Sequence, residues 1–547
     1  MLLSVIKCKL VCVFILFTVK SCNGLNATTI VLNKTLTWEN KELYNSFIIL
    51  NANSTLQVDC VNENLNISFI TFQVHSHLYN ITLYNTTNVY GSYVYGTNVG
   101  LYSSVIPKID TFFIMNQNEI DLRVYISVHG YDKYDPIPGG CNMEFPVPIS
   151  PSLRTKYTSD YILVDAAPAK DPIDDECNTT DKLVMLFYKM YLPEQNFDTI
   201  VYFEGIRQMM TLEYIQSYGE YVPDNGLHNR RMLSAYPGVG SVYVAIAFSV
   251  ANTSAYSVYV PTYSYACDPL IDGDCEVFDD ALSQLLCACL LFVGLFVCYF
   301  GHRFFKTEMF LIGLVSGGIV TYVLIALMAD LTRPALLGAS LLSGLCFGAI
   351  WLLFWWFYGI PVLAVFLATL NVGFLFSAII YYGLPGGLVA LESDVNFWTL
   401  FICIMLITSL LLVSMTFLSN ILCCAILGAY AVIYSMDYYL GSNLKYIVIN
   451  TIRRAVVPNF NRAVLSPPFE WNDSLISLLW IALVISGFLF QHFHNYGRPP
   501  FPPPPRSVRP SMPRSMYGTA GLRTGRSPRI SRQPRSTVIS ERSSLLA

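Results

Sequence analysis

Seven apolar segments follow one another in the second half of the chain, between Ala281 and Phe493. Each is close to the roughly 20 residues that an α-helix needs to cross the hydrocarbon core of a bilayer. With 54% hydrophobic and 13% charged residues, the 547-residue chain is also too apolar for an ordinary soluble protein. The sequence therefore predicts a seven-helix transmembrane domain, with spans at 281–300, 309–329, 335–357, 361–381, 397–417, 421–440 and 475–493.

Residues 1–24 have the features of a secretory signal peptide. Lys7 and Lys9 form its charged start, residues 10–19 are apolar, and Gly24 is a small residue at the expected cleavage point. The apolar run is too short for an eighth span. The signal predicts that the segment up to the first span is made in the lumen.

That segment is dense in Asn-X-Ser/Thr sequons, the acceptor sites for N-linked sugars. One sequon is weak evidence, whereas this density predicts a glycosylated surface. The eight predicted glycosylation sites are Asn26, Asn33, Asn53, Asn66, Asn80, Asn85, Asn178 and Asn252.

Five cysteines lie in the same segment, and an oxidising compartment favours disulfides between them. The odd number leaves one cysteine outside any pairing within the segment. Cys267 and Cys275 form the predicted pair, because the short loop between them is easily closed; the other pairings stay open. The remaining cysteines are Cys60, Cys141 and Cys177.

Apolar and polar residues alternate with a period of two through residues 25–266, which predicts half-buried β-strands. Turn signals such as Pro138-Gly139-Gly140 and Asp224-Asn225-Gly226 separate them. We predict a β-sandwich-like ectodomain of two units, 25–150 and 151–280, divided near Ser150. The clearest strands lie at 70–74, 122–128 and 242–250.

Two groups in the predicted ectodomain resemble metal ligands. His75 and His77 share one face of a strand, but no third ligand stands at a suitable spacing, so we interpret them as ordinary surface histidines. An acidic group lacks the spacing and turn glycine of a calcium loop, and we interpret it as a solvated loop. Nothing pairs a nucleophile with a base, so binding or shielding is the expected role. The acidic residues are Asp171, Asp174, Asp175 and Glu176.

Basic residues predict the orientation of the bundle. His302, Arg303 and Lys306 follow the first span, and ten arginines follow the last. The positive-inside rule places both stretches in the cytosol. The loop between spans six and seven does not follow this rule, because it is basic although it falls on the predicted outer side. Residues 444–457 of this loop are predicted to form a helix on the membrane surface. Its basic residues are Lys445, Arg453, Arg454 and Arg462.

Few polar groups lie within the spans. Glu308, Asp330 and Asp437 fall at span ends, and only Asn371 is strongly polar near a middle. A proton-coupled carrier needs such groups at depth, so the pattern argues against transport. Two Gly-xxx-Gly pairs predict close helix packing within the bundle, with a dimer contact as the alternative. They are Gly313 with Gly317 and Gly344 with Gly348.

Two functional classes with seven spans fit poorly. A rhodopsin-like receptor would end its third span with an Asp-Arg-Tyr-like triplet, whereas this span ends Trp355-Trp356-Phe357-Tyr358-Gly359, and the seventh lacks Asn-Pro-xx-Tyr. A zinc hydrolase would need converging histidines and a carboxylate. His302, Glu308, His492 and His494 share the cytosolic rim, but two residues apart on a helix point to opposite faces.

The start of the second span resembles the signature of the transmembrane seven superfamily member three family: Gly301-His302-Arg303-Phe304-Phe305-Lys306-Thr307-Glu308-Met309-Phe310-Leu311-Ile312-Gly313. The run Pro138-Gly139-Gly140-Cys141-Asn142-Met143-Glu144-Phe145 and the layout of residues 25–495 are similar too. The resemblance implies a multi-pass protein of the cell surface or secretory membranes that is associated with cell survival and protein-folding stress. It carries over no catalytic residue.

The tail, 494–547, is rich in Pro, Arg and Ser and is predicted to be disordered and cytosolic. Ten arginines against Glu541 favour contact with anionic membrane lipid. Phe501-Pro502-Pro503-Pro504-Pro505 resembles a ligand of polyproline-binding actin regulators. Glu541, Leu545 and Leu546 match an acidic dileucine sorting signal for clathrin adaptors.

The sequence thus predicts a non-enzymatic membrane glycoprotein with no cofactor, metal or nucleic-acid partner. We expect it at the plasma membrane with endosomal or secretory-pathway pools, its amino end outside and its carboxyl end in the cytosol. The alternative is an orphan receptor for an unknown extracellular ligand, and a membrane hydrolase or channel is less favoured.

Overall fold

The computed structural model describes residues 26–502, apart from 33–39, 63–66, 86–92, 105–108, 173–176, 178–181, 225, 253, 274, 276–280, 330, 385, 387 and 498–500. Several predictions fall outside the described residues. They concern the signal peptide, Asn33, Asn66, Asn178, Asp174, Asp175, Glu176, Asp330, the tail arginines, Pro503, Pro504, Pro505, Glu541, Leu545 and Leu546.

The first part of the ectodomain is a β-sandwich. Apolar residues from both sheets meet in one core, where the rings of Phe72 and Phe112 stack 4.3 Å apart. One sheet has the order β1 (Asn26–Leu32), β3 (Ser54–Asn62), β8 (Ile109–Asn116), β5 (Ile81–Asn85), β6 (Tyr93–Gly96). The other has the order β2 (Glu42–Leu50), β9 (Leu122–Tyr131), β4 (Phe69–Ser76), β7 (Asn98–Ser104).

The second part is another sandwich, and its core includes Val164 from one sheet and Phe187 from the other. Its smaller sheet has the order β10 (Arg154–Tyr157), β11 (Tyr161–Asp165), β14 (Arg230–Ser234). Its larger sheet has the order β13 (Glu220–Val222), β12 (Leu183–Glu194), β15 (Val239–Ser249), β16 (Tyr256–Val258), with β17 (Thr262–Ser264) also paired to β15. The β-sandwich-like ectodomain predicted from the alternation is confirmed.

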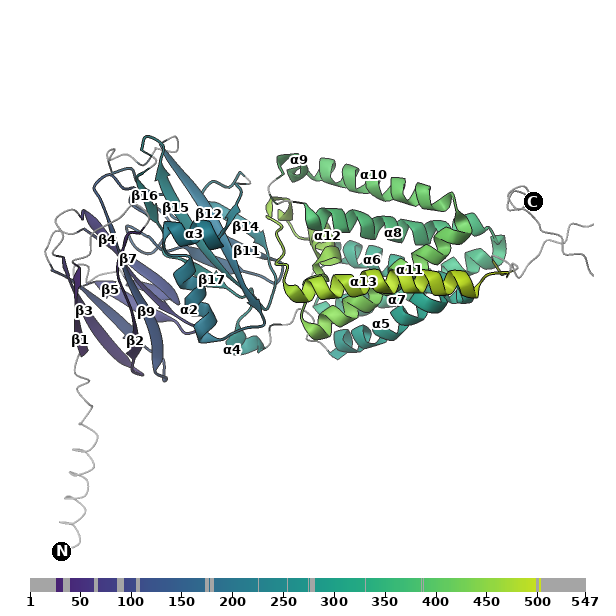
Figure 1. The fold of residues 1–547 in the computed structure, drawn as a ribbon, viewed down its shortest axis with the longest axis horizontal. Helices are drawn as coiled ribbons and strands as arrows, with labels where there is room; N and C mark the ends of the chain where they lie inside the picture. The colour runs from purple at the N-terminus through teal and green to yellow at the C-terminus, as the bar shows by residue number, and fades with distance from the viewer. Residues whose placement is uncertain are drawn as a thin grey trace, which may run out of the picture. The chain divides into compact units, whose positions relative to one another are not determined.

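Two helices in the second sandwich were not predicted. They are α2 (Thr199–Gln208) and α3 (Leu212–Tyr218), and Asp198 caps the first by accepting a hydrogen bond from Ile200 N at 3.1 Å. Their apolar residues pack on the face of β15 that carries Val242, Val244 and Ile246 (Figure 1). That face is therefore buried, which is why β15 is covered on both sides instead of being half-buried.

His75 and His77 are buried, so their interpretation as surface histidines is wrong. His75 lies in β4, all of whose residues are buried, and His77 follows the strand directly and contacts the second sandwich. His75 Nδ1 lies 2.7 Å from Asn98 Oδ1, and His77 Nε2 lies 3.2 Å from the Tyr265 hydroxyl. Burial lowers the pKa of each imidazole to about 4, so both are neutral hydrogen-bonding groups at neutral pH.

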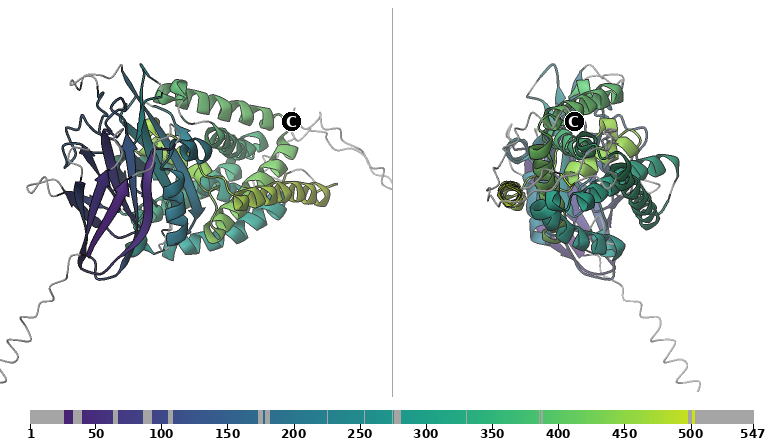
Figure 2. Two further views of the ribbon diagram at one scale, coloured as in Figure 1. Left: turned by 60° about the vertical axis from the view of Figure 1, so that its left-hand side comes forward. Right: turned by 90° about the vertical axis from the view of Figure 1, so that its right-hand side faces the viewer.

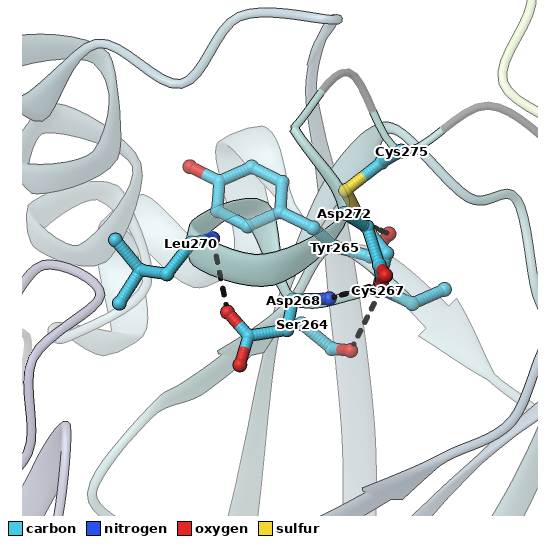
Figure 3. Close-up of a disulfide and its surroundings, with 8 residues drawn as sticks. Ser264, Tyr265, Cys267, Asp268, Leu270, Asp272 and Cys275 are labelled. Carbon is cyan, nitrogen blue, oxygen red and sulfur yellow. Dashed lines mark hydrogen bonds between the residues drawn. A yellow bond between two sulfur atoms is a disulfide. The ribbon is translucent and has the colours of Figure 1, made fainter.

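Two disulfides occur in the described ectodomain. Cys267 and Cys275 form the predicted pair around the short helix α4 (Pro269–Asp272), which Asp268 caps by accepting from Leu270 N (Figure 3). Cys141 joins Cys177, and Cys60 is buried without a disulfide partner. The two pairs tie down segments next to the first helix of the bundle and next to the division between the sandwiches.

The remaining chain forms long helices that run side by side; Figure 2 gives two further views of them. Among the described residues, six segments are long and apolar enough to cross a membrane, and the first of these, Ala281–Met328, has 48 residues. Large apolar side chains such as Phe292 and Leu411 are exposed on the outside of the bundle, where lipid would cover them. The helices after that first segment are α7 (Arg333–Tyr358), α8 (Pro361–Gly383), α9 (Val389–Glu392), α10 (Asp394–Val413), α11 (Thr416–Leu440), α12 (Tyr446–Val456) and α13 (Trp471–His494).

The 48-residue segment contains two helices, α5 (Ala281–Phe300) and α6 (Phe305–Met328), joined by a 3-10 turn at Gly301–Phe304. The start of α5 lies beside the end of α11, where the Tyr439 hydroxyl donates to Gln284 O. The end of α5 lies beside the end of α13, where His302 N donates to Gln491 Oε1. The later part of α6 returns to the ectodomain side, where Tyr322 and Asp160 line one cavity. The chain therefore reverses direction at the turn.

The two Gly-xxx-Gly pairs bring α6 and α7 into close contact within the bundle, as predicted. A Cβ atom on Gly348 would lie 2.6 Å from Phe310 O, and one on Gly344 would lie 2.6 Å from Leu314 O. Backbone atoms cannot move aside as flexible side chains can. These positions therefore require glycine.

We expect Gly348→Ala to lower the free energy of unfolding by about 1–3 kcal/mol, because the added methyl group overpacks the contact with α6. Gly338 on the same helix has no atom within 4 Å of a built Cβ and provides the matched control. Gly338→Ala should be neutral or slightly stabilising, because alanine favours helices. Melting temperatures of the detergent-solubilised proteins measure both effects, and equal values for the two variants would contradict the packing.

Candidate functional site

The candidate functional site is the junction between the second sandwich and the bundle. We define the junction as α12, the turn 441–445 before it and the segment 463–470 after it. One face of α12 carries Val448 and Ile452 toward the bundle, and the other buries Asn450 and Arg453 against the sandwich. The helix predicted at 444–457 is thus present. The second sandwich covers its polar face, and its position at the membrane surface stays a prediction.

Arg453 makes the densest set of contacts in the junction. Its guanidinium donates to Ser159 O at 2.6 Å, Ala235 O at 2.8 Å and the Asp160 carboxylate at 3.1 Å. Its side chain is 4% exposed, whereas that of Asp160 is 40% exposed. The backbone carbonyls therefore matter as much as the ion pair, because a buried guanidinium needs an acceptor for each donor group.

The four basic residues of the loop between α11 and α13, which do not follow the positive-inside rule, all pair with acidic residues. Arg453 pairs with Asp160 of the ectodomain and Lys445 with Glu194, while the other two pair with residues near the start of α10. The positive charge of this loop is thus neutralised within the protein. The remaining pairs are Arg454 with Asp394 at 2.9 Å and Arg462 with Glu392 at 3.9 Å.

Carboxylates gather at the start of α12 around Glu194, which ends strand β12. Asn443 Nδ2 donates to Glu194 Oε2 at 3.3 Å, and Lys445 Nζ lies 4.0 Å from Oε1. Burial raises the pKa of Glu194 to about 7 despite Lys445, and the carboxylates of Asp437, Asp473 and Glu470 raise it further. Glu194 therefore titrates near neutral pH.

Asp473 and Glu470 organise the start of α13 beside this cluster. The two side chains form a capping box, in which Glu470 N donates to Asp473 Oδ2 at 2.8 Å. Asp473 Oδ1 also accepts from Ser442 Oγ at 2.8 Å and Asn443 N at 2.7 Å. The cap thus joins the last span to the turn before α12.

A second ectodomain contact holds the segment after α12. Lys189 of β12 is 1% exposed and donates to Tyr191 Oη at 3.0 Å and to Ser466 O at 3.1 Å, with Glu220 Oε2 at 3.4 Å. Burial lowers the pKa of Lys189 to about 8 against the opposing effect of Glu220. Val464 extends the small sheet beside β14, donating to Met232 O at 2.8 Å. The loop between α12 and α13 is therefore part of the sandwich edge.

The signature residues recognised in the sequence lie at the opposite end of the bundle. Asn420 of α11 offers its amide nitrogen to His302 Nδ1 at 3.0 Å and to Glu308 Oε2 at 2.9 Å, and all three side chains are buried. Cys424 occupies the space that a Cβ on Gly301 would need. The signature thus fixes the α5–α6 turn against α11.

The rim histidines do not converge on a single centre. His494 Nε2 lies 2.8 Å from Arg303 Nη1, and the His492 ring stacks on Phe488. Across the part of the chain that the structure describes, no group of three or more His, Cys, Asp or Glu has a metal-binding arrangement. Asn371 donates to Ser316 Oγ at 2.7 Å, which links α8 to α6.

The predicted tail and sugar sites are described only in part. The Phe501 ring is half-buried and lies 5.3 Å from that of Phe305 at the bundle rim. Among the sequons, Asn53, Asn80 and Asn252 are exposed. Asn85 is half-buried, and Asn26 lies in β1. Glycosylation of these residues stays a prediction.

Family models match three consecutive stretches of the chain. Residues 38–131 match the TM7SF3-like N-terminal immunoglobulin-like domain, and residues 136–270 match the TM7SF3-like second immunoglobulin-like domain. Residues 287–492 match the TM7S3/TM198-like domain. Two immunoglobulin-like domains followed by apolar helices define a multi-pass membrane protein with an amino-terminal β-sandwich region.

Curated relatives extend the match over most of the chain. Transmembrane 7 superfamily member 3 of Rattus norvegicus is 30% identical over 458 residues, covering 80% of this chain and 81% of the rat protein. The Homo sapiens protein of that name is 29% identical over 458 residues, covering 80% of each chain. The chain belongs to the transmembrane 7 superfamily member 3 family.

We expect Arg453→Gln to lower the free energy of unfolding by about 2–4 kcal/mol, because it leaves the carbonyls of Ser159 and Ala235 buried without their donor. Arg462→Gln is the matched control, since Arg462 is 46% exposed and its ion pair is 3.9 Å long. The control should change stability by less than about 0.5 kcal/mol. Thermal unfolding of the solubilised proteins measures both, and equal losses would contradict the role of the buried contacts.

Glu194 should make the junction more stable in mild acid. The folded protein holds a proton on Glu194 up to about pH 7, whereas an unfolded carboxyl releases it near pH 4.5, so the free energy of unfolding falls as pH rises across that window. The slope is at most about 1.4 kcal/mol per pH unit. Glu194→Gln should remove this slope and stabilise the protein at pH 7.5, whereas Glu204→Gln, at an exposed position of α2, should not. Thermal unfolding at pH 5.5 and 7.5 measures this slope. An equal change in melting temperature between the two pH values for wild type and Glu194→Gln would contradict the assignment.

Proposed function

We propose that this protein is a non-enzymatic seven-pass glycoprotein whose ectodomain and bundle act as one body in supporting cell survival under protein-folding stress. The observation that carries the proposal is the buried Arg453 network, which fixes the second sandwich to α12. An ectodomain attached in this way transmits force and orientation to the helices, whereas one on a flexible linker would not. The link to survival and stress rests on the family resemblance.

Seven crossings are supported by the reversal between α5 and α6. If each helix crosses once, the 48-residue segment Ala281–Met328 contributes two spans and the bundle contributes seven. The ectodomain then lies outside, and the residues after α13 lie in the cytosol. Arg303 and Lys306 at the α5–α6 turn support this orientation through the positive-inside rule.

We propose that the protein resides at the plasma membrane and cycles through endosomal and secretory compartments. The exposed sequons at Asn53, Asn80 and Asn252 support passage through the lumen. Glu541, Leu545 and Leu546 would recruit clathrin adaptors to the tail. A polyproline-binding actin regulator would first have to detach Phe501 from Phe305, so that interaction is proposed as conditional on release of the ring.

The second candidate is an orphan receptor for an extracellular ligand. The same junction favours it, because a ligand that moved the second sandwich would move α12 and the start of α13 with it. The two candidates differ in whether an extracellular ligand is required. Both require that the junction hold the second sandwich firmly to α12.

The experiment is a rescue assay in cells that lack the endogenous protein, with survival measured after tunicamycin treatment. Wild type and Glu204→Gln should restore survival, because the Glu204–Arg207 pair is exposed and remote from the junction. Asp160→Asn should reach the surface but rescue at most half as well, since it weakens the coupling while leaving the carbonyl contacts of Arg453 intact. Survival that is fully restored by a chain without residues 25–280 would contradict both the coupling and the receptor.

A further inference from the structure

A cavity of about 380 Å³ lies beneath α12, among the ectodomain-side ends of α5, α6, α7 and α11. Its size falls within the range of about 300–1,000 Å³ that is typical of small-molecule sites. Leu314, Leu337 and Ile452 are among the apolar side chains that form most of its wall. None of the contacts of the junction or of the signature residues accounts for this space.

The position of the cavity indicates which solvent surrounds it. On α6 the lining extends from Leu314 to Tyr322, which spans about 12 Å of helix. The apolar face of α12 closes one side, and amphipathic helices place that face at the boundary between headgroups and acyl chains. The cavity therefore belongs to the outer half of the membrane, where lipid rather than water is available to fill it.

The polar groups around the cavity are few, and the charged ones stand at its mouth. They are Asp160, Arg333 and Arg453, with the Tyr322 hydroxyl beside them. The Arg453 guanidinium already donates to Asp160, Ser159 O and Ala235 O, so these hydrogen bonds would have to break before it could bind a ligand. Deeper inside, the Ser340 hydroxyl donates to Leu336 O at 2.7 Å. At the mouth, the exposed Asp160 carboxylate offers an acceptor for a neutral hydroxyl beside the exposed Arg333.

We infer that this cavity binds a sterol from the outer leaflet, with the fused rings beneath α12 and the hydroxyl directed toward Asp160. A single compact cavity accommodates one rigid apolar body, whereas the two chains of a phospholipid would leave most of their surface outside. The exposed Asp160 carboxylate can accept a hydrogen bond from the sterol hydroxyl while keeping its contact with Arg453. The site does not depend on the proposed role in cell survival, whereas the leaflet that supplies the sterol rests on the orientation proposed above.

Two glycines provide a matched test. Gly318 lines the cavity, and the nearest atom to a built Cβ is Ser340 O at 3.6 Å, so a side chain fits the backbone and extends into the space. Gly338 on α7 has no atom within 4 Å of a built Cβ and does not line the cavity. Leucine at Gly318 should fill the site, and leucine at Gly338 should not.

The experiment uses the purified full-length protein in nanodiscs with a photoreactive, clickable cholesterol analogue. Wild type and Gly338→Leu should be labelled on peptides from α6 and α12, and excess cholesterol should compete. Labelling of Gly318→Leu should fall at least about tenfold, since the occupied volume is lost. Ile452→Phe fills the cavity from α12 and gives an independent variant if the first one misfolds.

Three outcomes would overturn the inference. One is labelling of wild type that excess cholesterol does not reduce, which indicates nonspecific insertion. Another is equal labelling of the cavity-filling variants and Gly338→Leu. The third is stronger labelling of the same peptides by a photoreactive phospholipid, which would assign the space to an acyl chain.

Discussion

The arrangement of ectodomain and bundle depends on the burial of one guanidinium. Removing Arg453 from water is unfavourable unless every donor finds an acceptor, and those acceptors come from the 159–160 turn and from Ala235 after β14. Two separate segments of the sandwich must therefore be in place at once. Lys189 repeats the pattern on the other side of the junction, where its ammonium meets the chain at Ser466. The two buried cations thus hold α12 and the segment after it.

Buried polar side chains with hydrogen-bond partners inside the protein also occur deeper in the ectodomain. His75 and His77 lie where the two sandwiches meet, and each finds a neutral partner in place of water. Helix α2 packs at the same contact, where the Tyr202 ring is stacked 4.7 Å from the His77 ring. The ectodomain is consequently a series of layers in which β4 and β15 are both interior strands.

Local patterns in the sequence predicted where helices and strands lie better than they predicted which residues are buried and what those residues contact. Alternation located β4, β9 and β15, and apolar length located the long helices, although the predicted fifth span 397–417 runs past the end of α10 at Val413. The sequence analysis missed α2, even though Tyr202, Phe203 and Ile206 have helical spacing, because the neighbouring residues alternate. Burial of His75 could not be predicted, since it depends on contact between sandwiches that are distant in the chain. Lys189, Glu194 and Asn420 carry no local signal, whereas the Glu470–Asp473 capping box was recognisable from its spacing.

The acidic partners of the basic loop are synthesised before the loop itself. During synthesis, Asp160 and Glu194 are made more than two hundred residues before Arg453 and Lys445. The ectodomain is then available as a folded template when the loop emerges, and it offers carboxylates and carbonyls that the loop cannot supply itself. A domain made first would in this way act as a built-in chaperone for a membrane segment made last. Inherited damage to the sandwich would accordingly appear as faulty insertion of the final helix.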